Sequence, residues 1–231
     1  MIESKGRVKI VKFLDSYGAI VKTFNLRTGK IGNPYHKSMC GIGYIGQGKY
    51  KPTLNGKHSK EYNAWNNMIK RCYNEDYRSL VPSYKNVTVC EEWYNFQNFA
   101  EWYSNNYPFS ISGINFSLDK DLLQYDAENK IYSPETCIFL PEKINTYLAV
   151  NKSNNTSGVT GVNFDKNRNK WMCRVRDFSK SVNVNLGRFI DIEEAKRTYK
   201  EFKLIQDDKA RQYVRDLNYL PEEIIKLIRT V

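Results

Sequence analysis

The 231-residue sequence predicts an α+β fold in which small modules follow one another along the chain. Short stretches with the two-residue period of strands alternate with short stretches that have the helical period. Two polar segments, 51–60 and 151–157, interrupt this pattern as linkers do. The balance of basic and acidic residues also changes sign at these segments. We therefore expect four parts, which are residues 1–50, 61–150, 156–206 and 207–231.

The first part, residues 1–50, is predicted to be a basic β module. The apolar runs Val8–Leu14 and Ala19–Leu26 are typical of strands. A glycine-rich segment, 40–48, follows them. No Lys-Ser/Thr pair comes after these glycines and no helix is expected there, so the segment does not match a phosphate-cradling loop. We interpret the glycines as turns and points of close packing.

The second part, residues 61–150, combines helices with a strand–loop–strand–helix pattern. A first helix is indicated by the spacing of Tyr62, Trp65, Ile69 and Cys72, and a second by the aromatic face of Glu91–Asn105, whose aromatics we assign to the core. A short strand over Val87–Cys90 lies between them. The pattern that follows consists of strand Phe116–Leu123, loop Gln124–Glu135, strand Cys137–Leu140 and a helix from Glu142.

The third part, residues 156–206, is predicted to be a three-stranded antiparallel sheet packed on a helix. The strands are expected over Gly161–Asp165, Lys170–Arg176 and Ser181–Leu186, and the helix over Ile192–Ile205. Alternation places the side chains of Arg174 and Arg176 on one face and those of Cys173 and Val175 on the other. The tail, 207–231, is expected to end in a short helix, Pro221–Arg229.

Charge is distributed unevenly. The net charge is +11, which favours a polyanionic partner. Residues 1–60 carry 12 Lys and Arg against 2 acids, residues 61–150 carry 7 against 12, and residues 151–231 carry 17 against 11. An acidic centre between basic ends suits a hard cation such as Mg²⁺ held against a phosphate, and it equally suits an ordinary acidic surface.

Cysteine usage and the hydropathy pattern indicate an intracellular protein. The five cysteines are scattered, without a C-x-x-C pair, and no signal-type or membrane-length apolar run is present. We expect free thiols, no membrane partner and no small-molecule cofactor. A zinc site made by Cys72, Cys90 and Cys137 is conceivable but is not our expectation.

Two positions in the second part could hold a divalent cation. Asp119-Lys120-Asp121 lies near the end of an expected strand, and Asn145 lies on the helix that follows the next strand. A carboxylate and an amide oxygen that face each other can share Mg²⁺ or Mn²⁺, and the metal can stabilise charge on a phosphodiester. Taken alone, such a pair is also what an ordinary polar surface would contain.

The segment Tyr62–Leu148 resembles the phage-type HNH homing endonucleases. The resemblance rests on the combination of WNNMIKRCYN, VTVCEEWYNFQNFAEW and LDKDLL with YSPETCIFLPEKIN. It implies a ββα-metal module in which Asp119 and Asn145 bind Mg²⁺ or Mn²⁺. Lys120 occupies the position of the family's general-base histidine, which would leave Lys120 to stabilise a phosphate or oxyanion and Asp121 to act as base or second ligand. The two histidines, His36 and His58, lie outside this motif, and His58, which precedes the first helix, is an alternative base if the chain folds back.

The third part resembles the APETALA-type (ethylene-response-factor-like) DNA-binding domain. The segment that carries this resemblance is SGVTGVNFDKNRNKWMCRVRDFSKSVNVNLGRFIDIEEAKRTYKEF. The resemblance implies that the exposed face of the sheet enters the major groove of DNA. Matching positions assigns base-facing roles to Thr160, Asn163, Arg174, Arg176, Asn183 and Asn185, and phosphate-facing roles in the turns to Lys166, Arg168 and Lys180.

The expected function is sequence-specific binding of double-stranded DNA with metal-dependent phosphodiester cleavage. The chain would then be a monomeric homing-type endonuclease or nickase that acts in the cytoplasm of a bacterial host. The alternative is a catalytically silent DNA-binding regulator or counter-defence protein derived from such a nuclease. Lys120, in place of the histidine, favours this alternative, because a lysine remains mostly protonated near neutral pH unless it is buried.

Overall fold

The computed structural model describes residues 2–5, 8–14, 17–22, 25, 27, 31–149 and 157–229. The fold is α+β, as the sequence predicts, and it divides into two compact units. Unit 1 comprises Met1–Asn106 and Ala127–Glu135, and unit 2 comprises Tyr107–Asp126 and Thr136–Val231. The chain therefore passes between units inside the expected module 61–150. Residues 150–156, which contain most of the second expected linker, lie outside the described residues.

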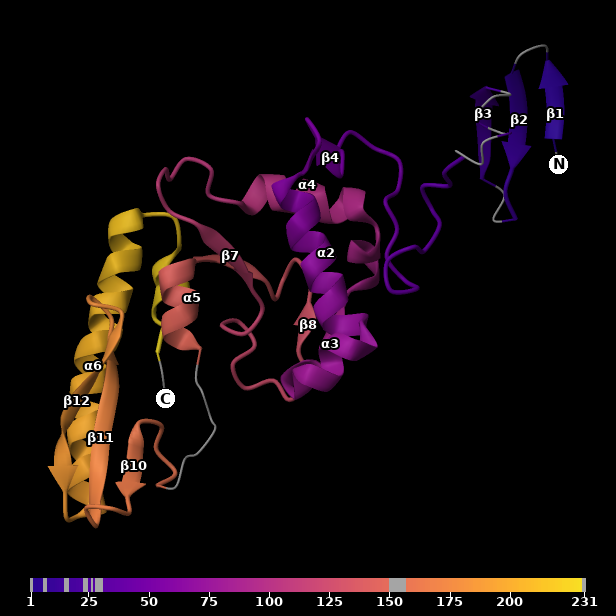
Figure 1. Cartoon of the computed structure of the whole chain (residues 1–231). Coiled ribbons are helices and arrows are strands. Elements are labelled where there is room, and N and C mark those ends of the chain that lie inside the picture. Colours follow the sequence, from indigo (N-terminus) through magenta and orange to yellow (C-terminus); the bar gives the residue numbers. More distant parts are fainter. Residues whose placement is uncertain are drawn as a thin grey trace. The chain divides into compact units, whose positions relative to one another are not determined.

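Unit 1 begins with a three-stranded antiparallel sheet (Figure 1). Its strands are β1 (Ile2–Lys5), β2 (Val8–Lys12) and β3 (Gly18–Lys22), in that order. Strand β2 falls within the first expected run, β3 overlaps the second but begins one residue before it, at Gly18, and β1 is an additional strand. The expected linker 51–60 contains a small hairpin, β4 (Thr53–Leu54) and β5 (Lys57–His58). Its turn residues Asn55 and Gly56 both have positive φ, which an Asn-Gly pair adopts readily.

The helical part of unit 1 encloses an aromatic core. Its elements are α2 (Lys60–Tyr73), α3 (Glu75–Leu80), η1 (Pro82–Tyr84), β6 (Thr88–Val89), η2 (Glu91–Tyr94), α4 (Phe96–Asn106) and β8 (Ile131–Tyr132). The indole Nε1 of Trp65 donates a 2.7 Å hydrogen bond to the carbonyl of Trp93, and the rings of Trp93 and Phe99 meet edge to face at 5.0 Å. All three side chains are fully buried, so the assignment of the aromatic stripe to the core is confirmed.

In unit 2, a short hairpin is followed by a helix. Strand β7 (Phe116–Asp119) pairs antiparallel with β9 (Ile138–Pro141), and α5 (Glu142–Leu148) follows. The first strand is shorter than expected. It ends at Asp119 because the carboxylate Oδ1 of Asp119 accepts hydrogen bonds from the backbone N–H groups of Asp121 and Leu122, which turns the chain away from the strand.

The C-terminal half of unit 2 contains the expected sheet and a longer helix. Strands β10 (Val162–Asp165), β11 (Lys170–Asp177) and β12 (Val182–Phe189) form an antiparallel sheet against α6 (Ile192–Leu217), as Figure 1 shows. Helix α6 crosses residues 206 and 207, where we expected a boundary. It begins at its cap Asp191 and ends at Asn218, which adopts the left-handed conformation.

The second half of α6 belongs to a core shared with the β7–β9 hairpin. Ala210 and Val214 pack with Leu140, Ile144 and Tyr147, together with residues of the short helix α7 (Glu222–Ile225). The expected tail, 207–231, is therefore part of the same hydrophobic core rather than an appendage, because its apolar residues continue the helical spacing of α6.

None of the helices in the described ranges combines the length and apolar character needed to cross a membrane.

Candidate functional site

The sheet of unit 2 separates a buried face from a polar face. Val162, Cys173 and Val175 point toward α6 and pack with Ala195 and Tyr199. Burial raises the pKa of the Cys173 thiol to about 11. This is the alternation that the sequence predicts, and it leaves the side chains of the intervening residues on the opposite face.

Arginine and asparagine residues are neighbours across the polar face. Arg174 lies opposite Asn185, and Arg176 lies opposite Asn183, in the register of β11 and β12. Arg174, Asn183 and Asn185 are exposed, and Arg176 is half-buried. Strands β11 and β12 therefore bring together four of the six residues to which a base-facing role was assigned, and Asn163 on β10 joins them through its pairing with Met172.

The two arginines of β11 make no ion pair or side-chain hydrogen bond with any other described residue. Several other arginines of unit 2 are engaged by acids. Arg188 contacts Asp165, Arg211 contacts Asp208 and Arg215 contacts Glu222. Because a guanidinium has five N–H donors, Arg174 and Arg176 present donors that the fold itself does not use.

Arg188 is a further residue on the polar face, which the sequence reasoning missed. A β-bulge in β12 leaves Leu186 without a direct partner, so Gly187 pairs with Cys173 and Arg188 pairs with Met172. Counting in twos from Asn185 would have placed Arg188 on the buried face; the bulge moves it to the polar one. The signal in the sequence was Gly187, whose φ of +137° few other residues tolerate.

The remaining assigned residues lie around this face. Asn163 pairs with Met172 and shares its face, whereas Thr160 lies in a turn before β10. Lys166 and Arg168 are in the β10–β11 turn, and Lys180 is in the β11–β12 turn; all three are exposed. Arg168 is engaged with Asp165, whose Oδ2 accepts from Nη1 of Arg168 at 3.3 Å and from Nε of Arg188 at 3.4 Å.

Gly161 permits the close approach of β10 to β11. Its φ is +89°, and a Cβ at this position would lie 2.3 Å from the carbonyl oxygen of Arg174 and 2.6 Å from the ring of Tyr199. The backbone N–H of Arg174 donates to the carbonyl of Gly161 at 2.8 Å. A glycine is therefore required at position 161, immediately before β10 begins.

Asp119 is buried at the end of β7. Its Oδ1 accepts the N–H groups of Asp121 at 3.0 Å and Leu122 at 2.8 Å. Burial raises the pKa of its carboxyl group, although these hydrogen bonds and Lys120 act in the opposite direction. One oxygen of the carboxylate thus has a structural role in the turn.

The position at which the resemblance implies a histidine is occupied by Lys120, a buried lysine that forms an ion pair with the half-exposed Asp121. The side chain of Lys120 is only 7% exposed, and its Nζ lies 2.8 Å from Oδ2 of Asp121. Asn145 lies on α5 and is half-buried, and its backbone carbonyl accepts a hydrogen bond from the N–H of Ala149. The cation of Lys120 therefore neutralises the carboxylate to which a second-ligand or base role was assigned.

Donor sets for a metal are sparse. Within the described ranges, no three side chains of His, Cys, Asp or Glu gather closely enough to hold an ion. Cys72 and Cys137 are buried and Cys90 is half-buried, and none of the three forms a disulfide within the described residues. The ring of His58 packs at a tilt against that of Tyr62, with the ring centroids 4.9 Å apart, and His36 is exposed in a turn.

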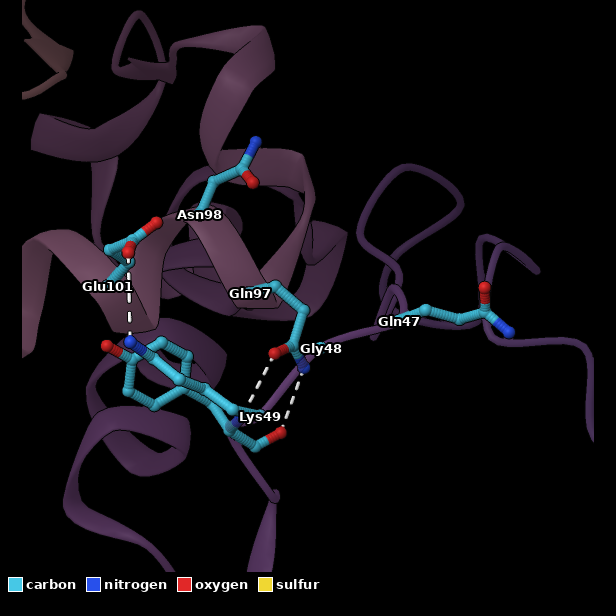
Figure 2. A pocket seen from close by; sticks show the side chains of 7 residues that line it. Gln47, Gly48, Lys49, Gln97, Asn98 and Glu101 are labelled. Carbon is cyan, nitrogen blue, oxygen red and sulfur yellow. Dashed lines mark hydrogen bonds and ion pairs between the residues drawn. The ribbon is translucent and has the colours of Figure 1, made fainter.

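Figure 2 shows a polar pocket in unit 1, and two of the residues that line it, Gln97 and Tyr50, are hydrogen-bonded to each other. The side-chain amide of Gln97, on α4, accepts from the N–H of Tyr50 at 3.0 Å and donates to its carbonyl at 2.9 Å. A Cβ on Gly48 would lie 2.2 Å from Oε1 of Gln97. The interpretation of the glycine-rich segment as a point of close packing is confirmed.

Comparison with protein-family models, with curated proteins and with solved structures gave no match to this chain in any of the three.

Proposed function

We propose that this chain binds double-stranded DNA through the polar face of β10, β11 and β12. The observation that carries the proposal is the pair of unengaged arginines on that face, each opposite an asparagine. Arginine can bond to O6 and N7 of guanine, and asparagine to N6 and N7 of adenine, in the major groove. A two- or three-stranded ribbon of this kind fits the width of that groove.

Charge around the sheet supports the same proposal. Lys166 and Lys180 lie in the turns at opposite ends of β11, where they can contact phosphates on either side of the base-reading face. Residues 151–231 carry a net excess of basic side chains. Phosphate contacts position a protein on DNA, and base contacts then select the sequence.

The test is selection of bound duplexes from a random pool by the full chain, followed by affinity measurements. Arg174→Gln and Arg176→Gln are each expected to weaken binding to the selected duplex by about 1–3 kcal/mol and to relax the preference at one or two positions. Arg197→Gln, which removes an exposed arginine from α6, is the matched control. A pool that yields no enriched sequence, or equal effects of all three substitutions, would contradict the proposal.

Metal-dependent cleavage is a second candidate, supported by one arrangement. Strand β7 ends in Asp119, β9 pairs with it, and α5 then carries Asn145, which is the order that a ββα-metal module requires. The side chains fit a divalent cation poorly, because Oδ1 of Asp119 is engaged by the backbone and Asp121 is neutralised by Lys120. We therefore assign no catalytic step to these residues.

Cleavage is tested on supercoiled DNA that contains the selected sequence, with Mg²⁺ or Mn²⁺. Nicking or linearisation that disappears in both Asp119→Ala and Asn145→Ala would establish the second candidate. Binding without cutting would leave the DNA-binding function alone, which is the result that the Lys120–Asp121 ion pair favours.

A further inference from the structure

Unit 1 contains an arginine surrounded by tyrosines. Arg71 lies near the end of α2, and its guanidinium is hydrogen-bonded to the hydroxyl of Tyr132. The hydroxyls of Tyr132 and Tyr84 are hydrogen-bonded to each other, and the rings of Tyr84 and Tyr77 meet edge to face at 5.7 Å. We call Arg71, Tyr77, Tyr84 and Tyr132 the Arg71 cluster.

The fold holds this cluster in place from several directions. Cys72, next to Arg71, is buried in the core, and the hydroxyl of Tyr73 accepts the backbone N–H of Val89 at 3.0 Å. Strand β6 in turn pairs with β8, which carries the buried Tyr132. Arg78 donates to the carbonyl of Lys85 and so ties α3 to the segment that contains Tyr84. The end of α2 is thereby fixed against the strand that bears Tyr132.

The guanidinium of Arg71 is not part of a salt bridge with any described residue, and its side chain is exposed. Burial of part of the group opposes its charge, but Tyr84, Tyr132 and Tyr77 more than compensate, so its pKa is raised. A permanently charged group with five donors is thus oriented by neutral hydroxyls. Orientation by hydroxyls leaves the positive charge uncompensated and available to an anion.

Local charge points to an anionic partner at the same place. Four of the seven basic residues between positions 61 and 150 fall within 70–85, where they face only two acids. The four are Lys70, Arg71, Arg78 and Lys85. Within the acidic central segment, the basic residues are therefore concentrated in the stretch of sequence that contains Arg71.

We propose that the Arg71 cluster binds a phosphate group of the DNA backbone. The planar guanidinium of Arg71 matches two phosphate oxygens, and the hydroxyl of Tyr77 can donate to a third. Tyr132 and Tyr84 are positioning residues, because they hold the guanidinium without touching the ligand. This inference rests on the proposed DNA binding and adds a contact on unit 1 that no base-reading residue provides.

The experiment measures the affinity of the full chain for a random-sequence duplex as a function of salt, because phosphate contacts are independent of sequence. Arg71→Gln is expected to weaken binding about 3- to 10-fold at about 100 mM salt and to lower the slope of log K against log salt by about one. Lys51→Gln, which removes an exposed charge elsewhere in unit 1, is the matched control and is expected to leave both values near wild type. Tyr132→Phe is expected to weaken binding while the slope changes little, as a positioning role requires.

Arg174→Gln separates the two proposals. Wild-type behaviour of Arg71→Gln beside weakened binding by Arg174→Gln would overturn the Arg71 assignment and leave the sheet as the DNA site. Absence of DNA binding by the wild type would overturn both. Phosphorus NMR with inorganic phosphate identifies the ligand source: saturable binding that Arg71→Gln abolishes, without an effect on DNA affinity, would show a free-phosphate site and contradict the backbone assignment. Circular dichroism of each variant establishes that it is folded.

Discussion

The hydroxyl of Tyr147 donates a 2.6 Å hydrogen bond to Oδ1 of Asp207, which lies 60 positions further along the chain. Lys203 completes the contact, with its Nζ 3.9 Å from the same carboxylate oxygen and 3.8 Å from the centre of the Tyr147 ring. All three side chains are buried. This polar cluster joins α5, which follows the β7–β9 hairpin, to α6, which supports the three-stranded sheet.

Stability should depend on the titration of Lys203. Burial lowers the pKa of Lys203 to about 8, against an ordinary value of 10.5, despite the attraction of Asp207. Between these two values the unfolded chain binds more protons than the folded one, so the free energy of unfolding rises with pH across this window. The rise amounts to at most roughly 3–4 kcal/mol, because each pKa unit corresponds to about 1.4 kcal/mol.

Lys203→Met removes this pH-dependent contribution to the free energy of unfolding and keeps most of the side-chain volume. Urea unfolding at several pH values should show a shallower rise for the variant than for the wild type between pH 8 and 10.5. The comparison uses the slope and not the absolute stability, because the variant also leaves Asp207 without its cation. Parallel curves for the two proteins would show that Lys203 titrates normally in the folded chain.

Asp119 should tolerate an amide better than a methyl group. Its folded pKa is raised by burial, so the ionised carboxyl disfavours folding above that pKa, and the penalty is absent at lower pH. Asp119→Asn keeps an oxygen that can accept both backbone N–H groups, and we expect its stability at neutral pH to equal or exceed that of the wild type. Asp119→Ala should lose about 1–3 kcal/mol, because two N–H groups lose their acceptor. Equal losses in the two variants, measured by denaturant unfolding, would show that the charge itself is needed.

Gly161→Ala should be strongly destabilising. The added Cβ would meet backbone at 2.3 Å and the Tyr199 ring at 2.6 Å, at a φ of +89°. Gly158→Ala is the matched control, since φ there is +78° and nothing lies within 4 Å of the added atom. The control should lose about 1–2 kcal/mol from backbone strain alone, and Gly161→Ala should lose more. Thermal melting that shifts equally in both would mean that β10 can move away from β11 without cost.

Asp165 should lower the affinity of the chain for DNA. Its carboxylate engages both Arg168 and Arg188 at the edge of the polar face. Asp165→Asn removes a negative charge there and releases the two guanidinium groups, so affinity for a duplex is expected to rise about 3- to 10-fold at low salt. Glu193→Gln, which breaks an ion pair with Lys196 on α6, is the control for loss of one acid. Fluorescence anisotropy that shows unchanged or weaker binding for Asp165→Asn would remove Arg168 and Arg188 from the interface.

Strand alternation was the most informative part of the sequence. The pattern around Arg174 and Arg176 fixes their face without reference to any long-range contact, and the observed register agrees with it. Alternation alone does not give the face of the residues that follow Leu186, because this extra residue interrupts the regular ladder. The bulge at Leu186 reverses the face of every later residue in β12, and only Gly187 signals this locally.

Long-range packing explains what the sequence could not reveal. Helix α6 was expected to end at Ile205, and the side chains of Leu204 and Ile205 are exposed. The helix continues because Ala210 and Val214 find a partner surface on α5 and β9, which are distant in sequence. Similarly, the grouping of Tyr132 with Arg71 depends on a contact between segments about 60 residues apart, which residue type and spacing do not encode.

The bulge in β12 also bears on how this chain can vary in length. Leu186 is the extra residue in the ladder, and its side chain packs at the margin of the core beneath the sheet. Removal of Leu186 would restore a regular ladder and keep Asn185 and Arg188 on the polar face, at the cost of some apolar contact. Descendants of a common ancestor can therefore differ by one residue here and still present the same side chains to a ligand, whereas a similar length change within β11 would invert the faces of the residues beyond it.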